Sequence, residues 1–226
     1  HARLHKYFGP DNRIIPGHEI LLMDYINGKP LSIKQLSNKK VIQQISQVYT
    51  IFHSQHRMGW GWFDNTFSGE NSSWLEFLLD IDNADLVFDA KVLPKSELQF
   101  VEDGLIRCVA EYQNPPVLLY GDFNPANFLV KSNGLIIPLD FQNCLSGDPL
   151  YDLGIGLTYS NDALALIPDS PQNNANSRTS LVYSMRVLLT KIGYAILTNK
   201  LEKISRYKKR YYELKNMYQR LQGRTL

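Results

Sequence analysis

The stretch Tyr120-Gly-Asp-Phe-Asn-Pro-Ala-Asn127 brings a carboxylate, Asp122, and the side-chain amide of its last residue into one short polar segment. The apolar run before this segment and the run Leu135-Ile-Ile-Pro-Leu139 after it are both typical of buried strands. Asn133-Gly134, directly before the second run, is a strong signal for a hairpin turn. We therefore expect a loop between strands, with the carboxylate of Asp140 facing it from the end of the second run.

These polar groups suggest a metal-dependent transfer reaction. A carboxylate and an amide oxygen are ligands that Mg²⁺ prefers, with water and phosphate oxygens completing its octahedral shell. A further carboxylate nearby can orient a hydroxyl group for attack on a phosphoryl group. An isolated Asp–Asn pair, in contrast, is usually a feature of turns. The interpretation therefore depends on the residues after the loop.

Two further motifs come after the loop. Leu139-Asp-Phe-Gln142 contains the second carboxylate, and Gly147-Asp-Pro-Leu-Tyr-Asp-Leu153 opens an apolar segment. Together with residues 120–127, in this order and spacing, they resemble the aminoglycoside phosphotransferases, choline kinases and related small-molecule kinases. The resemblance covers most of the chain from about Glu19. It implies an α+β fold, namely a protein-kinase-like C-terminal lobe that is mostly helical and has a small catalytic β-hairpin.

The resemblance also implies roles for individual residues. Asp122 falls on the catalytic aspartate, which orients the acceptor hydroxyl. Asn127 and Asp140 fall on the two Mg²⁺ ligands, and Asp152 falls on the aspartate that supports the loop, whereas His53 is left out of the expected site. The implied activity is ATP- and Mg²⁺-dependent phosphorylation of a hydroxyl group on a small molecule, such as an aminoglycoside-like antibiotic, an amino alcohol or a sugar metabolite.

An apolar segment near the start resembles the hinge between the two lobes of such kinases. It reads Leu21-Leu-Met-Asp-Tyr-Ile-Asn-Gly28, and on its own it would be interpreted only as a buried edge strand. By the resemblance, Met23 is the gatekeeper, and the backbone carbonyl of Asp24 and the backbone N–H of Ile26 meet the adenine of ATP.

The hinge divides the chain unequally. Residues 1–27 are expected to be a remnant of an N-terminal lobe with the hinge strand, and residues 28–226 a kinase-like C-terminal lobe with acceptor-binding helices. The residues before the hinge contain neither a glycine-rich loop nor a strand lysine for the phosphates. We therefore expect the missing N-terminal lobe in the full-length protein, and little phosphoryl transfer by this chain alone.

Local patterns predict several further elements. Apolar residues at helical spacing predict a helix over Ser32–Phe52, and the aromatic segment Trp60–Gly69 is expected to be a loop. Ser73 precedes Glu76 by three residues, which is the spacing of a helix capping box. A final helix over residues 200–222 carries one apolar stripe, which we expect to pack on the preceding helix while its Lys and Arg side chains stay in water.

Two features bear on the acceptor. Trp60, Trp62, Phe63 and Trp74 could form an aromatic wall for a cationic group, or they could belong to the core. The region between the hinge helix and the loop is acidic, and a negative wall would favour an amine-bearing substrate, although a solvated acidic face is the commoner outcome. Its acidic residues are Glu76, Asp80, Asp82, Asp85, Asp89, Glu97, Glu102 and Asp103.

Composition limits the protein class. The chain has 226 residues, 44% of them hydrophobic, which suits a folded domain with a sizeable core. Its two cysteines have no metal-ligand spacing and favour a reducing, cytoplasmic location. Residues 200–226 carry nine basic and two acidic side chains. We interpret them as the solvated face of a helix, and expect neither a nucleic-acid partner nor a membrane partner.

A rival interpretation is a catalytically inactive kinase-like binding module or scaffold. The absence of a phosphate-binding loop before the hinge favours this rival. Tyr120 also favours it, because the family usually has histidine at this position.

Overall fold

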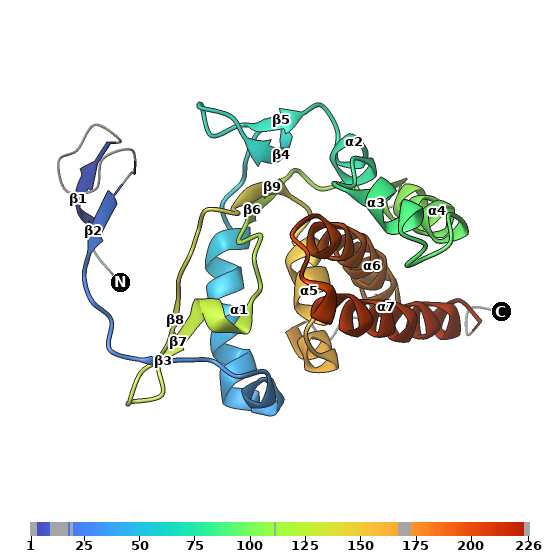
Figure 1. Cartoon of the computed structure of the whole chain (residues 1–226). Coiled ribbons are helices and arrows are strands. Elements are labelled where there is room, and N and C mark those ends of the chain that lie inside the picture. Colours follow the sequence, from blue (N-terminus) through green and yellow to red (C-terminus); the bar gives the residue numbers. More distant parts are fainter. Residues whose placement is uncertain (1–3, 10–17, 19, 111, 167–172, 224–226) are drawn as a thin grey trace.

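The computed structural model describes residues 4–9, 18, 20–110, 112–166 and 173–223. Its strands lie in three small sheets, and most of its helices form a body on the side away from the first hairpin (Figure 1). The architecture is α+β and mostly helical, as the sequence predicts.

One sheet contains the predicted hairpin. Strands β7 (Phe128–Val130) and β8 (Ile136–Pro138) pair antiparallel, and β3 (Lys29–Pro30) adds to the outer edge of β7. The turn between β7 and β8 contains Gly134, whose φ of 80° is in the left-handed region that favours glycine. The Asn-Gly signal therefore predicts this hairpin correctly.

A four-stranded sheet has the order β5-β4-β9-β6. Its strands are β4 (Trp60–Phe63), β5 (Gly69–Asn71), β6 (Val117–Leu119) and β9 (Leu145–Gly147). The expectation of a loop over Trp60–Gly69 is therefore wrong. The reason is a distant partner, since β4 pairs with β9 and only tertiary pairing makes so short a segment a strand.

The helix predicted over Ser32–Phe52 is divided into two. A 3₁₀ helix, η1 (Ile33–Ser37), precedes α1 (Lys39–His53). The division falls at Asn38, whose side chain accepts a hydrogen bond from the backbone N–H of Lys40 and so caps α1. An asparagine inside a run of helical spacing is thus a helix start here.

The predicted cap before Glu76 is present with one change. Ser73 accepts the backbone N–H of Glu76 at 3.1 Å and begins α2 (Trp74–Leu79). The Glu76 carboxylate, however, accepts from the backbone and hydroxyl of Ser72 rather than from Ser73. The helix start is therefore as predicted. The hydrogen bond that the Glu76 carboxylate accepts in return comes from Ser72, one residue before the cap.

The remaining helices build the body around α6 (Asn173–Leu197). They are α3 (Ala84–Asp89), α4 (Ser96–Ala110), α5 (Leu150–Leu157), the 3₁₀ helix η3 (Asn161–Leu166) and α7 (Leu201–Gln222). Helix α6 packs against α3, α4, α5 and α7 (Figure 1). Residues 175–197 of α6 have the length and mean hydropathy of a membrane span, yet most of that stretch is buried within the protein, as in a central core helix.

The final helix packs on α6, and Tyr211, Leu214 and Tyr218 of its predicted stripe are buried. Tyr211 also donates to Glu97 of α4, and the Tyr218 ring packs against Phe100 of α4. The predicted stripe is therefore confirmed. The expectation that its basic residues stay in water is wrong for two of them. Arg210 donates to the backbone carbonyl of Leu157, and Lys215 reaches a carboxylate on α4.

The first two strands, β1 (Leu4–Phe8) and β2 (Ile20–Met23), form an antiparallel hairpin. It lies apart from the helical body and leads through an extended segment into β3 (Figure 1). The side chain of Leu22 is 53% exposed. The division of the chain at residue 27 stays a prediction.

Candidate functional site

The loop at residues 120–127 is held from below by a buried carboxylate. Asp152, in the first turn of α5, is fully buried. One of its oxygens, Oδ1, accepts the backbone N–H of Gly121 at 2.8 Å, and Oδ2 accepts that of Tyr120 at 2.9 Å. The Nε2 atom of His53 lies 2.9 Å from the same Oδ2. The arrangement fits the supporting role that the resemblance assigned to Asp152.

Tyr120 replaces the family's usual histidine without leaving the loop unsupported. Its ring is buried between Phe52, Phe128 and Phe141. Its hydroxyl donates to the backbone carbonyl of Leu139, which immediately precedes the second carboxylate. Tyr120 therefore ties the start of the loop to the end of the hairpin, and the substitution retains a connection between the two halves of the site.

Gly121 is required by close packing. Its φ of 75° is in the left-handed region, and a Cβ on this residue would collide with the backbone carbonyl of Asn143. The close approach brings the 140–143 segment against the loop. It places the Asn143 side chain beside Asp122, although the two residues come from different ends of the hairpin.

Two amides hold the Asp122 carboxylate. Asn127 and Asn143 both donate from Nδ2 to its Oδ2, at 3.0 and 3.2 Å. Within the described residues no side chain or backbone group donates a hydrogen bond to Oδ1, so this oxygen keeps its capacity to accept one. Burial raises the pKa of Asp122, and the positive charge of Lys191 opposes that rise. A partly desolvated carboxylate with such an oxygen can orient an acceptor hydroxyl and accept its proton.

Asn127 and Asp140 present oxygens that suit a hard cation. Asn127 uses its amide nitrogen on Asp122, which leaves its amide oxygen for another partner. Asp140 is exposed and has a φ of 56°, a left-handed conformation that aspartate tolerates better than most residues. Its negative charge is also close enough to contribute to the raised pKa of Asp122, after burial. The charge of Asp140 at the end of the hairpin therefore acts on the carboxylate of the loop.

The donor set fits Mg²⁺ bound jointly with phosphate. In the described part of the chain, no three His, Cys, Asp or Glu side chains gather into a metal cluster. An amide oxygen and a carboxylate would therefore supply only part of an octahedral shell, and Mg²⁺ typically takes the rest from water and substrate phosphate. The two ligand assignments stay predictions.

The three hinge residues lie at the end of the first hairpin. Met23 ends β2, and Asp24 and Ile26 belong to the extended segment after it. This segment enters β3, where Lys29 pairs with Val130 of the hairpin. The structure thus connects the proposed adenine-binding segment directly to the sheet that contains the loop, and the contacts to adenine stay predictions.

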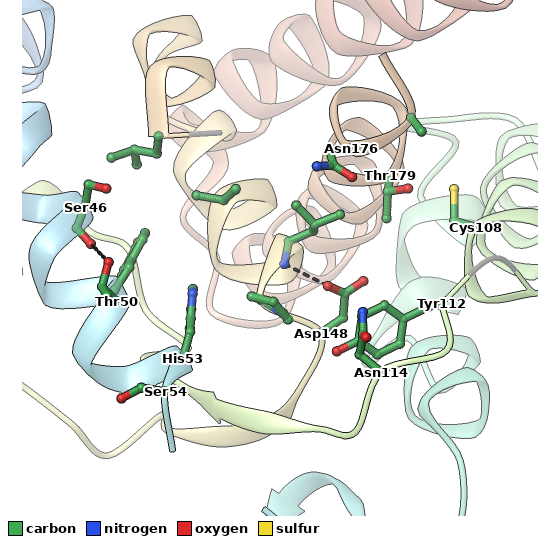
Figure 2. A pocket seen from close by; sticks show the side chains of 16 residues that line it. Ser46, Thr50, His53, Ser54, Cys108, Tyr112, Asn114, Asp148, Asn176 and Thr179 are labelled. Carbon is green, nitrogen blue, oxygen red and sulfur yellow. Dashed lines mark hydrogen bonds between the residues drawn. The ribbon is translucent and has the colours of Figure 1, made fainter. Parts of the chain in front are cut away.

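A cavity lies next to His53, which contacts the Asp152 anchor of the loop. It has a volume of about 840 Å³ and is lined from α1, α5 and α6. Figure 2 shows His53 and Asp148 facing this space from different elements. Tyr49 also lines it, and no partner is recorded within the described residues for its buried hydroxyl. Because His53 contacts Asp152, this cavity borders the anchor of the loop rather than Asp122.

Sequence reasoning missed three residues that the structure brings to the site. Asn143 comes three residues after the second carboxylate, so its closeness in sequence to Asp140 was a usable signal. His53 ends an amphipathic helix and gave no sign of its distant partner. Lys191 lies in an apolar stretch of α6, where a single lysine is easily overlooked.

Comparison with known proteins agrees with this geometry. The sequence pattern of the phosphotransferase enzyme family matches residues 11–175. The chain belongs to this family. No curated protein matches the chain significantly.

Solved structures of phosphotransferases share the fold. A thermostable mutant of aminoglycoside phosphotransferase APH(4)-Ia, in ternary complex with AMP-PNP and hygromycin B, has a TM-score of 0.72 and 16% identity, over 94% of this chain and 75% of that chain. A choline/ethanolamine kinase family protein from Mesorhizobium loti has a TM-score of 0.64 and 15% identity, and the match covers 96% of this chain and 76% of that protein's chain. Plasmodium vivax ethanolamine kinase has a TM-score of 0.65 and 14% identity, and the match covers 96% of this chain and 68% of the kinase chain.

These likenesses show that the α+β architecture is that of protein-kinase-like phosphotransferases. The family and fold expected from the sequence are both confirmed. The chain is therefore a member of a family of small-molecule phosphotransferases.

Proposed function

We propose that the protein transfers the terminal phosphoryl group of ATP to a hydroxyl group of a small molecule, in a Mg²⁺-dependent reaction. The observation that carries the proposal is the Asp122 carboxylate, which two amides hold through Oδ2 while no described residue donates to Oδ1. This geometry suits a group that orients a hydroxyl and takes its proton during transfer. The likeness to a solved phosphotransferase with AMP-PNP bound supports a nucleotide as donor.

Each residue of the site has a separate role in the proposed reaction. Asp122 positions the acceptor oxygen, and Asp152 keeps the loop that carries it in place through two backbone N–H groups. Asn127 and Asp140 would hold Mg²⁺, which neutralises phosphate charge when bound. The segment from Met23 to Ile26 would receive the adenine. In such a site catalysis comes mainly from positioning and electrostatics.

The inactive-module alternative makes the opposite prediction. Tyr120 was one of its two supports from the sequence, beside the lack of a phosphate-binding loop before the hinge. The hydroxyl of Tyr120 donates to the Leu139 carbonyl, however, and so links the two parts of the site. That contact favours the enzyme over the scaffold.

The test is a measurement of ADP formation by the full-length protein with Mg²⁺ and ATP, against a panel of amino sugars, amino alcohols, sugars and hydroxy acids. Turnover that depends on one acceptor class supports the proposal. Nucleotide binding without turnover on any acceptor would support the scaffold instead.

A further inference from the structure

A small basic pocket lies between α7 and the residues at the end of α5. It has a volume of about 230 Å³. Residues that line it include Thr158, Tyr159, Arg206, Tyr207, Lys209 and Arg210. Three of these side chains are cationic.

Lys191 connects this pocket electrostatically to Asp122. Its Nζ donates to Thr158 Oγ1 at 2.9 Å and lies 4.1 Å from the centroid of the Tyr159 ring. Both of these partners line the basic pocket. Burial lowers the pKa of Lys191 to about 7, the charge of Asp122 opposes the lowering, and the charge of Arg206 adds to it. Lys191 is therefore flanked by the predicted catalytic carboxylate and by a pocket cation.

Tyr159, which lines the pocket, is also in contact with the loop that carries Asp122. Its ring packs against Phe123, the residue directly after Asp122. Burial raises the pKa of the Tyr159 hydroxyl, and the charge of Asp122 contributes to that rise while that of Arg206 opposes it. The ring of Tyr159 is thus a wall that the pocket shares with the loop residue after Asp122.

The cations of the pocket differ in how far they are already engaged. Arg210 donates to the Leu157 carbonyl and to Asn161 Oδ1, and it pairs with Glu213 at 3.1 Å. Arg206 and Lys209 are exposed, and within the described residues neither has a recorded hydrogen bond or ion pair. The Arg206 guanidinium lies only over the ring of Tyr207, at 5.3 Å from its centroid.

An amine-bearing acceptor would meet unfavourable charge in this pocket. Glu213, the carboxylate that lines it, is already paired with Arg210. The acidic region that suggested a cationic acceptor lies elsewhere, and its Glu97 is bound to Lys215 on α7. Complementary charge is what an interface uses to select a partner, so free guanidinium and ammonium groups favour an anion.

We infer that the acceptor carries an anionic group, a carboxylate or a phosphate, which binds in the basic pocket through Arg206 and Lys209 while its hydroxyl faces Asp122. Lys191 is a positioning residue between the two, because it holds the shared wall at Thr158 and Tyr159. This inference rests on the proposed function, because it names the acceptor class of the same site. Guanidinium binds both anions in a bidentate manner, so the chemistry of the pocket is common to them.

The experiment uses the full-length protein and pairs of hydroxy compounds that differ only in the anionic group. Suitable pairs are a hydroxy acid with its amide, and a sugar phosphate with the sugar. ADP formation is measured with Mg²⁺ and ATP, and calorimetric titration of each compound measures binding without turnover. The carboxylate and phosphate pairs distinguish the two sources of negative charge.

Arg206→Gln is the main variant, and Arg220→Gln is its matched control, because Arg220 is exposed on the same helix and does not line the pocket. We expect the anionic member of a pair to be preferred, and Arg206→Gln to raise its KM or Kd by about 10- to 100-fold with little change in kcat. Arg206→Lys should restore part of the preference, and the control should behave as wild type. The neutral member should respond to none of these changes.

The outcomes separate the two proposals. Turnover that prefers neutral or amine-bearing acceptors, or an equal effect of Arg206→Gln on both members of a pair, would overturn the anionic acceptor while leaving the phosphotransferase intact. Anion binding that depends on Arg206 without any ADP formation would support the pocket and count against the phosphotransferase.

Discussion

The carboxylate of Asp152 accepts a hydrogen bond from the backbone N–H of Gly121 at 2.8 Å, although 31 residues separate the two in sequence. The same carboxylate receives the N–H of Tyr120 and lies within hydrogen-bond distance of His53 Nε2. Helix α1, the loop and helix α5 therefore meet at one buried carboxyl group. The loop that presents Asp122 is positioned by this contact rather than by its own sequence alone.

Asp152→Asn should weaken that anchor. The amide nitrogen of the new side chain would face one of the two backbone N–H groups that now donate to Asp152, those of Tyr120 and Gly121. That buried N–H would then have no acceptor. The expected loss is about 1–3 kcal/mol of unfolding free energy, together with a lower kcat. Urea denaturation of both proteins measures the first and ADP formation the second. Asp85→Asn, at an exposed position of α3, is the control. Unchanged stability in Asp152→Asn would contradict the role assigned to this carboxylate.

Asp122→Asn tests the chemistry itself. An amide can still receive the two amide donors through its oxygen, but it cannot take a proton from the acceptor. We expect kcat to fall by about 10²- to 10⁴-fold with little change in ATP binding. Steady-state kinetics and nucleotide titration give the two quantities. Near wild-type turnover would mean that another group accepts the proton.

The sequence predicted the local elements better than the distant contacts. Asn133-Gly134 identified the hairpin and Ser73 identified a helix start, because each depends on the backbone preferences of a few neighbouring residues. Strand β4 was mistaken for a loop, because its partner β9 lies far along the chain.

In the site, too, local contacts could be predicted better than distant ones. Asp122 and Asn127 are five residues apart in one motif and meet by a hydrogen bond in the structure. Asn143 reaches Asp122 only because Gly121 lets the 140–143 segment come close. The charge of Lys191 acts on Asp122 only through the packing of α6, which no local pattern specifies. Contacts within a motif could be predicted from local pattern, whereas among the contacts made by folding only the one of Asp152 with the loop was expected, from the family resemblance.

Asp148→Asn should remove a pH dependence of stability. Burial raises the pKa of the Asp148 carboxyl from 3.8 to about 6. Between these values the folded protein binds a proton that the unfolded chain has lost, so the contribution of this group to stability falls as pH rises. It is fully present below pH about 4 and lost above pH about 6.

The comparison is between unfolding free energies of wild type and Asp148→Asn across this pH range. The difference between the two proteins should favour wild type most at the acid end and shrink toward pH 6. Asp89→Asn, exposed on α3, should track wild type throughout. A difference that grows with rising pH would show that Asp148 is ionised in the folded protein across the whole range.

Lys215 and Glu97 fasten the final helix to α4, and breaking the pair should loosen that attachment. The ammonium lies 2.8 and 2.6 Å from the two carboxylate oxygens, and the hydroxyl of Tyr211 donates to the same group at 2.9 Å. Lys215→Met would leave a buried carboxylate without its counter-ion, at a cost of about 3 kcal/mol in unfolding free energy.

Adding Glu97→Gln removes the unpaired charge and keeps a partner for Tyr211, so the double variant should recover most of the loss. Arg220→Met, exposed on the same helix, should change stability by less than about 0.5 kcal/mol. If the double variant were as unstable as the single one, the pair would matter for its packing and not for its charge.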